Sequence, residues 1–136
     1  MAPFEVIEGA TTQLCRPDGL AVDSAGDLWV ADGEGRILEF APGAHGDVAP
    51  IRDITGSNTT FDYPTDVKIG SDGEIYVVDN DHFSVDVFPK NSTGNVAPSR
   101  TIAGSNTGFT AYAPYSIALQ SDGTIVIGSR YNAIQT

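Results

Sequence analysis

One stretch of the chain occurs twice. Residues 46–61 read GDVAPIRDITGSNTTF and residues 94–109 read GNVAPSRTIAGSNTGF, a near copy that begins 48 positions later. A period of 40–50 residues with short apolar segments in each unit is typical of propellers and similar arrays, whose units bury their faces only against neighbouring units. The chain is therefore predicted to fold as a row of similar modules.

The repeat extends beyond this stretch on both sides. Segments that begin with proline occupy residues 17–23, 64–70 and 114–120, and each is followed by a turn with glycine and by a short apolar run. The runs are rich in β-branched and aromatic residues, and no window shows a convincing helical period, so each unit is predicted to contain short strands.

Four strands are predicted in a complete unit. First strands are expected at 20–23, 67–70 and 117–120, second strands at 27–31, 74–78 and 124–128, third strands at 36–40 and 84–88, and fourth strands at 51–55 and 99–103. The third and fourth strands alternate apolar and polar residues, so one face of each is expected to be solvated. Phe61 and Phe109 are expected to fill the gaps between neighbouring units.

Extending the alignment of the repeats toward both termini gives the boundaries of the units. The chain is predicted to begin with a lone fourth strand at 4–8, followed by a blade at 17–63, a blade at 64–113 and a partial blade at 114–136. The prediction is an all-β fold of β-propeller blades, about three four-stranded antiparallel blades per chain, with residues 1–136 forming one unit that is half of a six-bladed propeller.

The repeat pattern resembles the NHL repeat, most fully at residues 17–32 and 36–40. The second unit departs from it at Asp66 and Ser84, and the third keeps Pro114, one strand and Asp122-Gly123. This resemblance implies a six-bladed propeller. Related gluconolactonase-like propellers hold a divalent metal with acidic and amide ligands, so Asp18, Asp66 and Asp79, with Asn80, would hold Ca or Zn if the chain were such a lactonase or hydrolase.

A three-blade arc leaves strand edges unpaired, and unpaired edges invite pairing with another chain. Two copies would make six blades, each lone fourth strand completing the partner's partial blade. A homodimer is therefore predicted; the alternative is that the chain is a fragment of a longer propeller.

Composition excludes some classes of partner. The net charge is −11, which disfavours binding to phosphate backbones, so no nucleic-acid partner is expected. No apolar run is long enough to cross a membrane, and no membrane partner is expected. No signal peptide is visible, so the localisation stays open between the cytoplasm and a secreted protein that lacks its leader.

The chain lacks the common catalytic motifs, so the main expectation is a binding scaffold without a cofactor. Loops between second and third strands share one rim with the loops that join units. This rim is predicted to recognise a protein or peptide through exposed aromatic and charged side chains. The candidate residues are Asp32, Arg36, Asp66, Asp79, His82, Tyr115, Arg130 and Tyr131.

Overall fold

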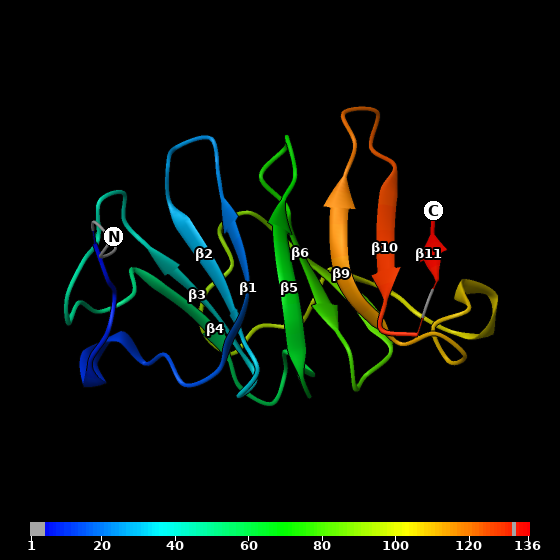
Figure 1. Ribbon diagram of the computed structural model, residues 1–136, viewed down its shortest axis with the longest axis horizontal. Coiled ribbons are helices and arrows are strands. Elements are labelled where there is room, and N and C mark those ends of the chain that lie inside the picture. Colours follow the sequence, from blue (N-terminus) through cyan, green and yellow to red (C-terminus); the bar gives the residue numbers. More distant parts are fainter. Residues whose placement is uncertain (1–4, 132) are drawn as a thin grey trace.

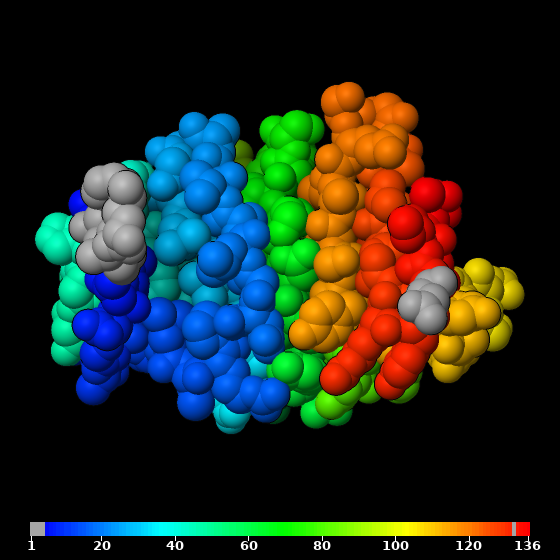
Figure 2. All heavy atoms as spheres, in the orientation of Figure 1, coloured from blue at the N-terminus to red at the C-terminus, as the bar shows by residue number. Residues whose placement is uncertain are grey.

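The structure is a computed structural model that describes residues 5–131 and 133–136. Within these residues the chain forms three antiparallel sheets, which lie side by side in chain order (Figure 1). Figure 2 shows the same order in the space-filling view. Blade 1 contains β1 (Pro17–Val22), β2 (Leu28–Asp32), β3 (Arg36–Phe40) and β4 (Arg52–Thr55). Blade 2 contains β5 (Pro64–Ile69), β6 (Ile75–Asp79), β7 (Ser84–Phe88) and β8 (Arg100–Ile102). Blade 3 contains β9 (Pro114–Leu119), β10 (Ile125–Ser129) and β11 (Ile134–Gln135).

The strands of each blade pair with their neighbours in sequence, and the all-β, blade-like architecture is confirmed. The first strands begin three residues earlier than expected, at the proline, because a bulge lets each proline pair with the end of the second strand. The turns after the first strands hold Gly26, Gly73 and Gly123 at φ of 89°, 85° and 88°, a conformation that favours glycine. Two short 3-10 helices, Ala10–Thr12 and Ser105–Thr107, lie in connections, and no helix in the described residues could span a membrane.

The expectation that the third strands have a solvated face is wrong. All of β7 is buried, as are the last four residues of β3. The alternating polar residues Glu39 and Asp86 are fully buried, because the third strands lie inside their sheets and packed neighbours cover both faces. Blade 2 has a blade on each side, whereas the outer face of β3 in blade 1 packs against Ile7 and Val48. Both acids have polar partners: Arg52 lies against Glu39, while Ser84 and Thr101 donate hydrogen bonds to Asp86.

The hydrophobic core lies between the blades. Trp29, Ile54 and Val77 pack together where blade 1 meets blade 2. Phe61 lies against this cluster with its ring centroid 5.3 Å from that of Phe88. Phe109 is buried in the equivalent cluster between blades 2 and 3, so the expected gap-filling role of both phenylalanines is confirmed.

The residues before blade 1 take the place that a fourth strand has beside the next blade. Val6 O accepts a hydrogen bond from Gly46 N at 2.7 Å, just as Asp53 O in β4 accepts one from Gly94 N at 2.7 Å. Ile7 makes a parallel bridge to Gly46 and packs on the outer core of blade 1. Residues 5–8 form only this bridge and no strand, and residue 4 of the predicted strand lies outside the described residues.

Candidate functional site

One end of the row of blades is formed by the connections between blades and by the turns after the second strands. This end, here called the loop rim, comprises residues 13–18, 32–36, 61–66, 79–83, 109–115 and 129–131. The rim lies at the lower edge in Figure 1, and the glycine turns lie at the upper edge. Prolines 17, 64 and 114 pair with the last residues of β2, β6 and β10, which brings both sets of loops together.

Asp32 and Asp79 hold the rim together. Asp79 is fully buried, and its carboxylate accepts hydrogen bonds from the backbone N–H groups of Asp62, Tyr63 and His82 at 2.7, 2.9 and 3.2 Å. Asp32 is also buried and accepts equivalent bonds from the backbone of Cys15, Arg16 and Glu34. These carboxylates close the connection and the turn of each blade, as short acidic side chains do in tight loops.

Asp66 joins two blades. Its Oδ1 accepts from Val67 N and from Lys68 Nζ, and its Oδ2 accepts from Ile117 N of blade 3 at 2.9 Å. The equivalent position in blade 1 is Gly19, where a Cβ would lie 2.5 Å from the Asp66 Cα. The departure from the repeat pattern at Asp66 therefore follows from how the blades pack.

Two arginine–tyrosine pairs lie on the rim. The Arg16 guanidinium carbon is 4.7 Å from the Tyr63 ring centroid, and that of Arg130 is 5.8 Å from the Tyr115 ring centroid. A hydrogen bond to Asp18 is the main reason that the pKa of Tyr63 is raised, with Tyr115 adding a smaller electrostatic contribution. Arg16, Asp18 and Tyr63 thus form one polar and aromatic cluster across the first two blades, toward Tyr115.

Other predicted residues on the rim have different surroundings. Arg36 donates to Gln13 Oε1 at 2.7 Å and lies 3.7 Å from an Asp53 oxygen. His82 and Tyr131 are exposed. Sequence reasoning brought Tyr115 and Arg130 together correctly but missed Arg16 and Tyr63. Both immediately precede the repeat's proline, and that shared position was the available signal.

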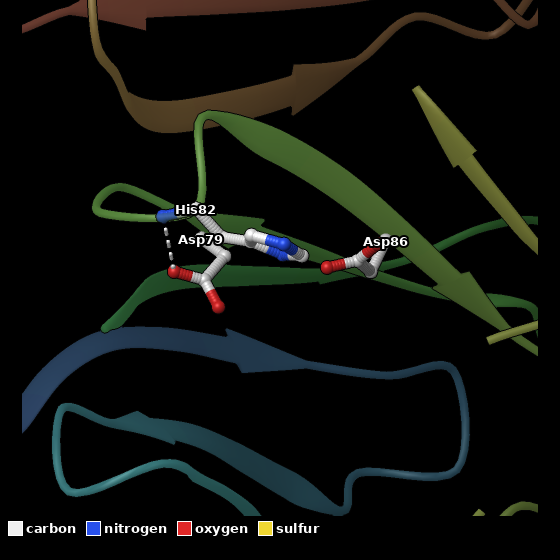
Figure 3. Close-up of side chains that lie close together, drawn as sticks. All are labelled: Asp79, His82 and Asp86. Carbon is white, nitrogen blue, oxygen red and sulfur yellow. Dashed lines mark hydrogen bonds between the residues drawn. The ribbon is translucent and has the colours of Figure 1, made fainter. Parts of the chain in front are cut away.

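Asp79, His82 and Asp86 place one ligand atom each within 4.8 Å of one another (Figure 3). The imidazole of His82 points toward the Asp86 carboxylate. Thr101 Oγ1 and Ser84 Oγ donate to Asp86 at 2.6 and 3.0 Å, and burial raises the pKa of Asp86 despite these bonds. Both buried carboxylates of this group already have protein donors, three backbone N–H groups at Asp79 and two hydroxyl groups at Asp86, so neither has an orphaned oxygen among the described residues.

A second group in the described residues, Asp23, Asp27 and Glu39, meets the same distance limit at the opposite end of blade 1. Asp18 and Asp66 belong to neither group. The three aspartates suggested as metal ligands from the sequence, Asp18, Asp66 and Asp79, therefore do not form such a cluster among the described residues.

The sequence profile of the NHL repeat matches residues 14–36 and 61–88, which cover β1, β2 and the blade 2 strands β5 to β7. The chain contains NHL repeats. The matched segments carry Arg16, Asp32, Tyr63 and Asp79, so the rim described above is built largely from NHL-repeat positions. A sequence comparison with curated proteins finds no match.

Solved structures of other propellers resemble the chain. Virginiamycin B lyase from Staphylococcus aureus matches with a TM-score of 0.65 and 21% identity, over 91% of this chain and 38% of that one. Hydrazine synthase of Kuenenia stuttgartiensis matches with a TM-score of 0.60 and 22% identity, over 82% and 29%. The WD40 β-propeller domain of Doa1 matches with a TM-score of 0.61 and 20% identity, over 85% and 34%.

At these identities the resemblance establishes the β-propeller fold alone. The chain spans about a third of the length of these structures.

Proposed function

We propose that the NHL blades form a binding scaffold whose loop rim recognises a protein or peptide segment. The observation that carries the proposal is the pair of arginine–tyrosine contacts on the rim, Arg16 with Tyr63 and Arg130 with Tyr115. Tyrosine and arginine side chains are among those that most often dominate the energy of protein interfaces, and Tyr63 and Tyr115 are both half-buried at the rim.

The chemistry of the rim favours an acidic peptide. The Arg16 side chain is 53% exposed and lies 3.8 Å from Glu34, which is exposed as well, so this ion pair is weak and open to exchange. The planar guanidinium can bind a carboxylate through two parallel hydrogen bonds, while the face of Tyr63 supports it from below. An extended peptide with an acidic side chain next to an apolar one matches this arrangement.

Fluorescence anisotropy with labelled acidic, basic and uncharged peptides of equal length tests the proposal. We expect the acidic peptides to bind best, and Arg16→Ala and Tyr63→Ala each to weaken binding about tenfold or more. Lys90→Ala, at an exposed lysine in the loop of the opposite end, is the matched control and should leave affinity unchanged. Equal affinity for all three charge classes, or unaltered binding in both rim variants, would refute it.

We further propose that two copies of the chain associate through the outer faces of their terminal blades. On blade 1, Leu20 and Val22 of the first strand are 58% and 69% exposed. On blade 3, Ile134 of β11 is 77% exposed. The same faces of blade 2 are covered by neighbours and form the two interblade cores, so each outer face has a complementary surface on a second copy.

Unpaired backbone groups support the same interface between two copies. In the described residues β11 pairs only with β10, which leaves its other edge open. Residues 5–8 already bond to the following loop as β4 does, and their other edge could pair with β11 of a second copy. Static light scattering on the purified chain tests this: a mass of two chains is expected, and Leu20→Asp or Ile134→Asp should give the mass of one. Phe83→Asp, at an exposed aromatic of the middle blade, is the control. A single-chain mass for the unmodified protein would refute the dimer.

A further inference from the structure

The end of blade 1 opposite the loop rim carries a compact group of carboxylates. Asp23 and Asp27 flank the turn between β1 and β2, and Glu39 lies in β3. One carboxylate oxygen of each residue lies within 4.8 Å of the others. Oxygens that bind one calcium ion at 2.3–2.6 Å are at most about 5 Å apart, so this spacing fits a shared ion.

Glu39 is the unusual member of the group. Its side chain is 1% exposed, and Oε1 has no hydrogen-bond partner among the described residues. Oε2 forms an ion pair with Arg52 Nε at 2.7 Å. An orphaned carboxylate oxygen that is buried is costly, and a bound cation is one way to satisfy it.

The local charge also favours a cation. Arg52 faces three carboxylates, which leaves a formal charge of −2 for this group of four. A second nitrogen of the Arg52 guanidinium, Nη1, already donates a hydrogen bond to Lys90 O at 2.6 Å. Burial raises the pKa of Glu39, and Asp27 and Asp23 raise it further against the effect of Arg52, so the carboxylates repel one another.

Solvent can reach this place. A cleft of about 660 Å³ between blades 1 and 2 is lined by Asp23, Asp27, Trp29 and Arg52. Asp72 and Lys90 also line it, and their charges offset each other. Water in the cleft can complete the six to eight oxygen ligands that calcium takes, since three side chains supply only part of the shell.

Blade 2 provides an internal comparison. Arg100 stands where Arg52 stands, and it donates to Glu74, the equivalent of Asp27. Gly70 and Val87 occupy the positions of Asp23 and Glu39. Blade 2 therefore has one carboxylate for one arginine at these positions, whereas blade 1 carries two further acids. Of these, Asp23 also holds the turn, because it accepts hydrogen bonds from Ala25 N and Asp27 N at 2.9 and 3.0 Å.

We propose that Asp23, Asp27 and Glu39 bind a divalent cation of the calcium class. Ligands that are all oxygen select hard cations over zinc, and three carboxylates suit the flexible shell of calcium better than magnesium, which demands a near-ideal octahedron and binds through one or two carboxylates and several waters. Trp29 Nε1 donates to Asp23 Oδ2 at 3.1 Å, which places the chain's one tryptophan beside the ion. Protein calcium sites span Kd values from about 10⁻⁹ to 10⁻³ M according to ligand charge and rigidity, and with three protein carboxylates this site is expected at the weak end, about 10⁻⁴–10⁻³ M.

Terbium luminescence and thermal unfolding test the site. Terbium takes the same oxygen ligands as calcium, and selective excitation of Trp29 should sensitise a terbium ion only when it is bound nearby. We expect terbium emission that calcium displaces, and a rise in Tm of about 9 °C at a calcium concentration near 100 times Kd. In Asp27→Asn and in Glu39→Gln the affinity for the ion should fall at least tenfold. Both signals should then be weaker or absent at a given concentration of the ion.

Glu74→Gln is the matched control, because it changes the equivalent position of blade 2 and should leave both signals intact. Asp27→Asn keeps the test decisive if Glu39→Gln fails to fold, since Asp27 is only half-buried. Absence of sensitised emission and of any Tm shift in the unmodified chain would overturn the proposal. Equal calcium responses in Asp27→Asn and the unmodified chain would overturn it too, by placing the ion elsewhere.

Discussion

Replacing Asp79 with alanine should cost the protein a large part of its stability without touching an exposed surface. The Asp79 carboxylate is fully buried and accepts three backbone hydrogen bonds, from Asp62, Tyr63 and His82, at 2.7, 2.9 and 3.2 Å. Alanine leaves three N–H donors without a partner at the point where two loops meet. These donors belong to two separate loops, so one substitution loosens both.

The magnitude follows from the kind of bond. A hydrogen bond to a charged group contributes about 1.5–3 kcal/mol, and the longest of the three is the weakest. Water can reach part of the opened loop and recover some of the loss. We therefore expect the free energy of unfolding to fall by about 3–5 kcal/mol, which lies at the upper end for a single substitution.

Urea unfolding followed by Trp29 fluorescence measures this loss as a shift of the midpoint at constant slope. Asp32→Ala removes the same three bonds from blade 1 and should cost a similar amount. Asp81→Ala, at the exposed neighbouring acid, should change stability by less than about 0.5 kcal/mol. A loss below about 1 kcal/mol for Asp79→Ala would show that the carboxylate does not hold the loops, and would return it to the set of ligand-binding candidates.

Three further substitutions test the packing and the buried charge. Gly19→Ala should destabilise the chain by at least about 2 kcal/mol in urea unfolding, because its Cβ would meet the Asp66 backbone at 2.5 Å. Phe61→Ala should cost about 3–5 kcal/mol by the same assay, since it empties the space beside Phe88. Burial raises the pKa of Asp86, so ionisation of this group destabilises the fold above its folded pKa, and the penalty is relieved as the pH falls toward the ordinary value of about 4. The unmodified chain should therefore gain stability relative to Asp86→Asn from neutral to acidic pH in urea titrations.

The blade architecture could be predicted because the sequence contains the same pattern in several units. Each unit supplies the same order of proline, glycine turn and apolar runs, so an error in one unit is corrected by the next. The strand prediction failed at residues 5–8. Residues 5–8 read as a strand by alignment with β4, but a strand needs a partner on its own sheet, and only the contact with the following loop is present.

Burial of the third strands could not be predicted from their pattern. Alternating apolar and polar residues in β3 and β7 are typical of a half-solvated strand, and the same alternation suits a strand that buries its polar side chains against partners. The deciding partners are far away in the chain: Arg52 for Glu39, and Thr101 for Asp86. Only the packing of the neighbouring blades shows which situation applies.

The position of the loop rim could be predicted from the sequence, but only some of its side chains and contacts could. Loops that share one end of the blades follow from the strand order, so exposure of His82 and Tyr131 there was within reach of sequence reasoning. The contact between Arg16 and Tyr63 crosses from one blade to the next. Such a contact depends on the angle between blades, which no residue pattern within a unit encodes.

Differences between aligned units separate packing requirements from chemistry. Gly19 and Asp66 differ because a side chain at Gly19 would collide with the neighbouring blade, so structure alone explains that pair. Glu39 and Val87 also occupy equivalent positions, and both are fully buried. Valine shows that an apolar side chain suffices there, whereas a buried glutamate with an orphaned oxygen is costly to the fold. No packing requirement explains Glu39, and the proposed cation held with Asp23 and Asp27 would give its carboxylate a further partner.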